Sequence, residues 1–215
     1  LLYVGRLSPE KGIYNLIKMF DKLDNDEELS IVGYSNNASF SNTIINLLGY
    51  CSDEDLLKKK LHGRSFEEQV VRLASEKART VSMDNPEAFV IGSDNMCTID
   101  DEIFDKPIDH EDAVNHLSSL SGKKHFQNNG ISIFHEGREV WSNFDVTELE
   151  MKKLSLQEIE DYLNLDKPYS ACGCYHFESN GKDLFTNING LESTVMGLAM
   201  EHLIEKLNQL GIIEL

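Results

Sequence analysis

The sequence predicts an α/β protein in which helices flank a mixed β-sheet. Three observations favour this class. A strand–helix–strand pattern opens the chain, a run of β-forming residues stands at 89–91, and two alternating segments, 125–134 and 139–149, flank a short polar turn. The opening pattern is typical of parallel strands and the last pattern of an antiparallel hairpin, so both directions are expected in one sheet. A chain of 215 residues can bury a sizeable core.

The opening pattern is an atypical β-α-β segment. Leu1–Val4 and Leu29–Val32 are the expected strands, and Lys11–Leu23 is the expected amphipathic helix. The character of the sequence changes after this segment. We therefore expect two units, residues 1–60 and residues 61–215.

Local capping signals predict the helices that follow. Ser65 with Glu68, and Ser155 with Glu158, form the pattern of a capping box, and Asp109 can cap another helix. The expected helices span 65–80, 109–120 and 155–167, and a closing helix lies within 191–210.

The segment Ala88–Met96 gives the sharpest prediction of a site. Residues 89–91 suit a strand buried on both faces, and Gly92 would let the backbone turn sharply at its end. Asp94 would then stand on an exposed turn, where ligands gather in open α/β sheets. The alternative is that Ser93 and Asp94 merely form an Asx-type turn.

Composition excludes several functions. A net charge of −17 argues against broad contact with nucleic acid or an anionic membrane surface, and a metal cation is expected to help hold an anionic ligand. No apolar segment reaches transmembrane length and no signal peptide is recognisable.

Four cysteines are too few for a disulfide framework, so a reducing cytoplasm is expected. The Cys172-Gly-Cys174 pair could be half a metal site, but no matching pair exists and buried thiols are favoured.

Two stretches near the start are distinctive, LLYVGRLSPEKG at 1–12 and ELSIVGY at 28–34. They resemble the opening of the donor-nucleotide domain of retaining glycosyltransferases with two Rossmann lobes. That resemblance implies that Arg6 and Lys11 hold the diphosphate of a nucleotide sugar. The chain is too short for a complete enzyme of that type, so this reading leaves only a nucleotide-sugar-binding remnant.

A second and longer set of motifs begins at about residue 62. It comprises RLASEKA (72–78), VIGSDN (90–95), DKP (105–107), LSSLSG (117–122), IEDY (159–162), CGCY (172–175) and VMGL (195–198). Together these resemble the Maf family of nucleotide pyrophosphatases, whose fold is similar to that of inosine triphosphatase. The stretch 173–178 looks most like the subgroup that acts on 7-methyl-GTP, whereas other members prefer dTTP and UTP.

The resemblance implies hydrolysis of a nucleoside triphosphate between its α and β phosphates, with a divalent metal, Mg or Mn. Asp94 matches the proton acceptor and could also ligate the metal. Lys77 and Lys106 match lysines that face the phosphates, although without these motifs both would be read as solvated surface lysines. Asn95 and Glu178 match positions tied to base selection, and a carboxylate suits a methylated, cationic guanine. Glu178 could instead be a surface glutamate.

Aromatic side chains could stack on such a cationic ring. Tyr175, Phe177 and Trp141 are the available candidates, and each is equally credible as core. The seven histidines show no metal-ligand spacing, so no role is assigned to them.

The chain departs from the Maf pattern at its start. Maf proteins place two arginines after a Ser-Pro pair, whereas here Ser8-Pro9 precedes Glu10 and Lys11. Ser8 and Lys11 are therefore the expected phosphate ligands of this region. The family's early acidic metal ligand has no firm match, which leaves Asp53, Glu54 and Asp55 as weak candidates.

Three readings follow. The first is an active pyrophosphatase in which the β-α-β segment replaces the family's own start. A homodimer is possible, because Maf proteins often dimerise. The second is a catalytically impaired nucleotide-binding protein, expected if losing the arginine pair removes transition-state contacts. The third is the glycosyltransferase remnant. The first 60 residues could alternatively be an appendage on a core that lacks its first strand.

Overall fold

The computed structural model describes residues 1–4, 30–32 and 54–213. The predicted helix Lys11–Leu23 lies outside the described residues. So do Arg6, Ser8, Lys11 and Asp53 of the predicted sites.

One mixed sheet organises the molecule. Its strand order is β2-β1-β3-β5-β6-β7, with β4 paired to β3 beside that path. β1 runs parallel to both β2 and β3, and the remaining pairs are antiparallel. The predicted mixed α/β fold is therefore confirmed, and the first strand of the chain joins the sheet beside β3. The strands are β1 (Leu2–Val4), β2 (Ser30–Val32), β3 (Val90–Ile99), β4 (Glu102–Phe104), β5 (Lys124–His135), β6 (Arg138–Met151) and β7 (Phe185–Asn189).

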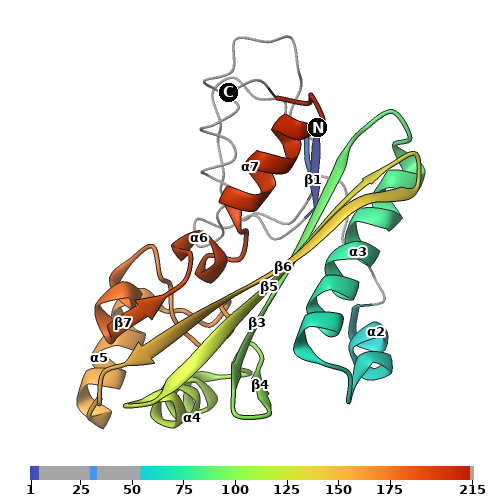
Figure 1. Ribbon diagram of the computed structural model, residues 1–215. Coiled ribbons are helices and arrows are strands. Elements are labelled where there is room, and N and C mark those ends of the chain that lie inside the picture. Colours follow the sequence, from blue (N-terminus) through green and yellow to red (C-terminus); the bar gives the residue numbers. More distant parts are fainter. Residues whose placement is uncertain (5–29, 33–53, 214–215) are drawn as a thin grey trace.

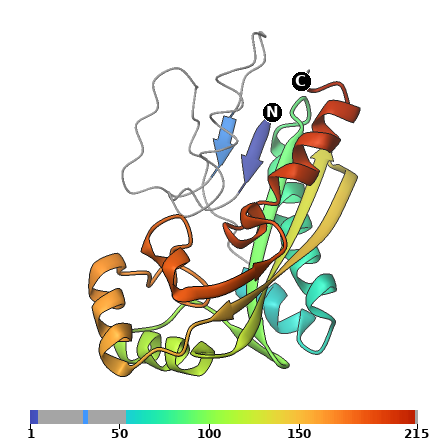
Figure 2. The same cartoon turned by 60° about the vertical axis from the view of Figure 1, so that its left-hand side comes forward.

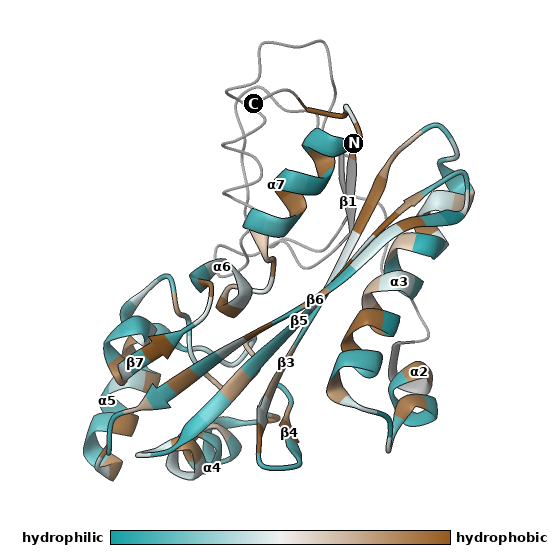
Figure 3. Cartoon of the chain, in the orientation of Figure 1, coloured by the Kyte–Doolittle hydropathy of each residue, from teal (hydrophilic) through white to brown (hydrophobic). Residues whose placement is uncertain are grey.

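Helices lie on both sides of the long strands, as Figures 1 and 2 show. α3 runs beside one side of β3, β5 and β6, and α7 lies on the other. In Figure 3, α7 carries hydrophilic and hydrophobic residues on different sides, as expected of a helix that packs with one side only. The helices are α2 (Glu54–Leu61), α3 (Phe66–Asp84), α4 (His110–Leu120), α5 (Leu156–Asp166), the 3₁₀ helix η1 (Asn180–Leu184), α6 (Glu192–Val195) and α7 (Met200–Gln209).

The predicted caps are confirmed. The hydroxyl of Ser65 accepts from the Glu68 amide at 3.2 Å, and Asp109 caps α4 in the same way. Ser155 forms a complete capping box with Glu158. The predicted hairpin is also present, as strands β5 and β6. β7, whose residues are mostly polar and exposed, was not predicted.

The predicted turn at Gly92 is wrong, because β3 continues through Gly92 to Ile99. A Cβ atom at Gly92 would lie 2.2 Å from the carbonyl oxygen of Ala74 and 3.0 Å from the Cβ of Ala78. Glycine is therefore required by the close approach of α3 and not by a change of chain direction. Asp94 accordingly lies within a strand and not on an exposed turn.

Candidate active site

On one edge of β3, no strand of the described residues pairs with the segment that carries Asp94 and Asn95, and we call this stretch the open edge. β5 pairs with one edge of β3 along residues 90–98. On the other edge, β1 pairs with residues 90–92 and β4 with residues 97–99. Within the described part of the chain, no strand pairs with residues 93–96 on this edge. A ligand at this edge could reach side chains from both faces of the sheet.

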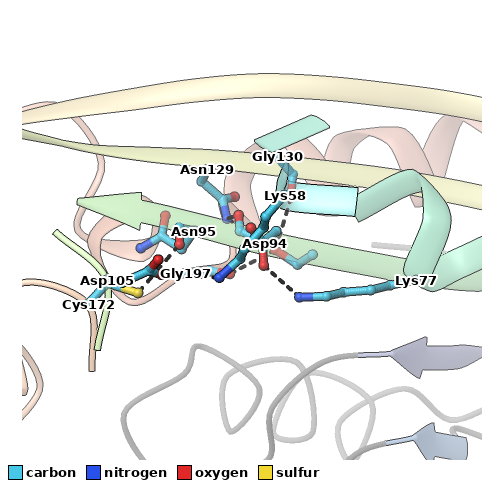
Figure 4. Close-up of polar contacts among 10 residues, drawn as sticks. Lys58, Lys77, Asp94, Asn95, Asp105, Asn129, Gly130, Cys172 and Gly197 are labelled. Atoms are coloured by element: carbon cyan, nitrogen blue, oxygen red, sulfur yellow. Dashed lines mark hydrogen bonds and ion pairs between the residues drawn. The ribbon is translucent and has the colours of Figure 1, made fainter. Parts of the chain in front are cut away.

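Asp94 faces α3. Successive side chains of a strand point to opposite faces, and Gly92 and Met96, which share the face of Asp94, contact α3. From α3, Lys77 Nζ forms an ion pair with Asp94 Oδ1 at 2.6 Å, as Figure 4 shows. The two side chains are only 16% and 12% exposed. Low exposure strengthens the attraction between opposite charges, so the pair holds the carboxylate in a fixed position.

A second glycine brings α3 close to this carboxylate. Gly130 lies directly opposite Asp94 on β5. A Cβ atom there would lie 2.5 Å from the carbonyl oxygen of Val70 in α3. The absence of a side chain at Gly130 therefore lets the first half of α3 approach the sheet beside Asp94.

Asn129 holds the backbone of the site. This side chain is fully buried, and its Nδ2 donates to the Asp94 carbonyl at 2.8 Å and to the Ser93 hydroxyl at 3.1 Å. Its Oδ1 accepts from the amide of Ala199 at 3.0 Å, just before α7. The Ser93 hydroxyl in turn donates to the Gly197 carbonyl at 2.8 Å. These bonds connect β3, β5 and the segment between α6 and α7 at one point.

Asn95 faces the side of the sheet opposite Asp94. Its Nδ2 donates to Gln127 Oε1 at 2.8 Å and to the carbonyl of Val195 in α6 at 3.4 Å. The thiol of Cys172 donates to the Asn95 carbonyl at 3.7 Å. In Figure 4, Lys77 and Asp94 point toward one another, whereas Asn95 points away from Lys77.

Comparison with known proteins decides the family. Residues 43–210 match the family model described as "Maf-like protein". The chain belongs to the Maf family. A relative from Legionella pneumophila (strain Paris), named nucleoside triphosphate pyrophosphatase, is 36% identical over 76% of this chain and 81% of its own length. A relative from Rhizobium etli, named 7-methyl-GTP pyrophosphatase, is 39% identical over 66% of this chain and 72% of its own length.

The predicted enzyme class, a Maf-family hydrolase of phosphoric anhydrides, is thereby confirmed. The matches give no support to the glycosyltransferase resemblance of residues 1–60. The boundary between residues 60 and 61 stays a prediction.

Lys106, which the Maf resemblance identifies as a phosphate-binding lysine, lies on an exposed segment after β4. Lys106 is exposed and follows Asp105, whose Oδ1 forms an ion pair with Lys58 of α2 at 3.1 Å. In the described part of the chain, Lys106 forms no ion pair. Of the two predicted phosphate-binding lysines that are described, the structure thus brings Lys77 to Asp94 and leaves Lys106 exposed beyond the end of β4.

The predicted base-selecting residue Glu178 lies in an exposed turn that leads into η1. It follows Tyr175 and Phe177, which are buried in the same core cluster as Cys97. Cys97 shares the face of Asn95, so the segment before Glu178 packs on that side of the sheet. Tyr175 and Phe177 therefore belong to the core, one of the two readings that their sequence allowed.

Sequence reasoning missed the polar residues of β5. Gln127, Asn128 and Asn129 are consecutive and all buried in the middle of a strand. Buried amides require partners, and here they bond to β3, to the Tyr175 hydroxyl and to the Ala199 amide. Three amides interrupting an otherwise alternating strand were the signal that could have revealed them.

Among the described residues, no group of three or more His, Cys, Asp or Glu side chains could hold a metal ion. Cys97, Cys172 and Cys174 are free thiols, and Cys97 and Cys174 are buried. Within the described residues, no helix is both long and apolar enough to cross a membrane.

Proposed function

We propose that the chain hydrolyses 7-methyl-GTP to 7-methyl-GMP and pyrophosphate. Membership of the Maf family supports the reaction class. The observation that carries the proposal is the Lys77–Asp94 ion pair at the open edge of β3. It places a carboxylate and a cation side by side, where both could meet a triphosphate.

Asp94 would orient a water molecule for attack on the α-phosphorus and accept its proton. The water oxygen bonds to phosphorus while the bond from phosphorus to the bridging oxygen breaks. That oxygen leaves with the pyrophosphate. The ammonium of Lys77 would offset negative charge on the transferring group, and Lys106 and Lys11 are proposed to do so on the leaving phosphates. Ser8 is proposed to donate a hydrogen bond to them.

A divalent cation, Mg or Mn, is part of the proposal. Mg²⁺ is commonly held by one or two carboxylates together with substrate phosphates, and the single carboxylate of Asp94 fits that type of site. When bound, the cation would neutralise phosphate charge, which matters for a protein with a net charge of −17.

The base preference rests on charge. Methylation at N7 gives guanine a positive charge, and Glu178 offers an exposed carboxylate beside the segment that packs on the Asn95 face. The Rhizobium etli relative, named 7-methyl-GTP pyrophosphatase, is 39% identical. A Glu178→Gln variant should therefore lose preference for 7-methyl-GTP over GTP.

The test is pyrophosphate release in Mg²⁺ from 7-methyl-GTP, GTP, dTTP and UTP. We expect 7-methyl-GTP to be turned over fastest. Faster turnover of dTTP or UTP would contradict the base assignment and leave the pyrophosphatase itself intact. If the folded protein releases no pyrophosphate from any of them, the alternative of an impaired nucleotide-binding protein stands.

A further inference from the structure

A buried polar network ends at Asn95. Asn95 Nδ2 donates to Gln127 Oε1 at 2.8 Å, and Gln127 Nε2 donates to the Tyr175 hydroxyl at 2.7 Å. Gln127 and Tyr175 are 2% and 4% exposed, so water hardly competes for these bonds. We propose that Gln127 is a positioning residue that fixes the Asn95 amide with its oxygen free to accept a hydrogen bond from the nucleobase. This inference rests on the proposed function, because it concerns the base bound in the same site.

A backbone carbonyl sets which way the Asn95 amide faces. The Val195 carbonyl can only accept a hydrogen bond, and it lies 3.4 Å from Asn95 Nδ2. Gln127 Oε1 accepts from the same nitrogen. Turning the amide over would place its oxygen against two acceptor oxygens. The amide NH₂ is therefore directed inward, and Oδ1 takes the remaining direction.

At the other end of the network, Tyr175 and His125 hold Gln127 in place. The Tyr175 hydroxyl also bonds to His125 Nε2 at 2.9 Å. His125 is fully buried, and burial lowers its pKa to about 4, so the imidazole is neutral near pH 7. The network is then uncharged and directional, which suits the reading of hydrogen-bond polarity on a base rather than the binding of an ion.

The oxygen of the Asn95 amide requires a hydrogen-bond donor from the ligand. Asn95 Oδ1 is buried and has no hydrogen-bond partner among the described residues. Buried polar atoms normally find partners, and residues 93–96 lie at the open edge of β3. Guanine, uracil and thymine carry a hydrogen on the ring nitrogen of their pairing edge and can supply the donor. Adenine and cytosine present a bare acceptor nitrogen there and would be disfavoured.

The affinities for nucleoside monophosphates, measured by calorimetry, test this inference without relying on turnover. We expect the protein to bind GMP more tightly than AMP, and UMP more tightly than CMP, by about tenfold, the size of one discriminating hydrogen bond. In Gln127→Met both ratios should fall toward one, because only the longer bond to the Val195 carbonyl, at 3.4 Å, would still oppose turning of the Asn95 amide. Gln69→Met is the matched control, since Gln69 is also buried, at 7% exposure, and its side chain bonds, among the described residues, to the nearby Arg64 carbonyl.

Two further variants distinguish a positioning role of Gln127 from a general disturbance of the structure. In an Asn95→Ala background, Gln127→Met should change neither ratio further, because its effect passes through Asn95. Gln127→Glu keeps an oxygen that accepts from Asn95 and should retain the preference. Ratios near one in the native protein, unchanged ratios in Gln127→Met, a further change in the Asn95→Ala background, or lost preference in Gln127→Glu would each overturn the inference. Preserved ratios without pyrophosphate release would overturn the proposed reaction alone.

Discussion

On the α3 face of β3 the side chain of Asp94 meets a cation, whereas on the opposite face the amide of Asn95 meets a neutral amide and a backbone carbonyl. The two residues are adjacent in the chain, and the alternation of the strand alone separates them. An ion pair responds to charge, and a fixed amide responds to the placement of donors and acceptors. Under the proposed function, this difference would divide phosphate chemistry and base recognition between the two faces of one strand.

The faces also differ in what surrounds them. Gly92 and Gly130 remove side chains on the α3 face and bring the helix close. On the other face, Asn129 and Gln127 fill the space with buried amides. Substitutions on the first face should therefore change rate and packing, and substitutions on the second should change which base is preferred.

The largest expected effect on the charged face is that of Asp94→Asn. An amide cannot accept the proton of water, so turnover of every nucleotide should fall by about 10² to 10⁴. Steady-state pyrophosphate release measures this. Asp100→Asn makes the same chemical change in the exposed turn between β3 and β4, where asparagine also tolerates the φ of 53°. Equal losses in the two variants would count against a role for Asp94.

Lys77→Met should lower turnover by about tenfold to a hundredfold, because charge compensation is lost. It also leaves the Asp94 carboxylate, 12% exposed, without this ion pair. The free energy of unfolding should therefore drop by about 2 to 3 kcal/mol, less than for a fully buried pair. Urea denaturation is the measurement. Lys123→Met, at an exposed position, should leave both quantities unchanged.

Gly92→Ala should destabilise the fold by at least about 3 kcal/mol, because the new Cβ would meet a backbone oxygen of α3 at 2.2 Å. Thermal unfolding reports the loss. A variant with the stability of the native protein would show that α3 can move away from β3 without cost, and would contradict the requirement for glycine at this position.

The smallest effect at neutral pH is expected from His125, on the Asn95 face of the sheet, whose contribution grows only as the pH falls. Burial lowers the pKa of His125 from 6.5 to about 4, so the unfolded chain takes up a proton that the folded protein refuses. Stability should therefore fall as the pH drops from about 6.5 to about 4, by up to about 3 kcal/mol from this residue. His125→Phe should flatten that part of the stability profile, whereas the exposed His62→Phe should not. An equally steep decline in His125→Phe would show that other groups cause it.

Sequence features that act locally predicted their elements well. The caps at Ser65, Asp109 and Ser155 depend on residues three positions apart, and all three occur. The predicted turn at Gly92 was wrong because a glycine in an apolar run gives the same sequence signal whether the chain turns there or a helix packs closely against it. Only contact with Ala74, distant in the sequence, distinguishes the two.

The residues of the site could be predicted from motifs, but their arrangement depends on contacts between segments that are distant in the sequence. Asp94 and Lys77 were identified through motifs, and the structure joins them. That Asn95 faces away from Asp94 follows only once β3 is known to continue past Gly92. The hydrogen bond from Asn95 to Gln127 depends on the register of β3 and β5, which no local pattern specifies.

The division between the two faces of β3 is tested most directly by kcat/KM of Lys77→Met and Asn95→Ala for 7-methyl-GTP, GTP, dTTP, UTP and ATP. We predict that Lys77→Met lowers all five values by a similar factor and keeps their order, and that Asn95→Ala changes the order, with ATP gaining on GTP. A changed order in Lys77→Met, together with a uniform loss in Asn95→Ala, would contradict the account.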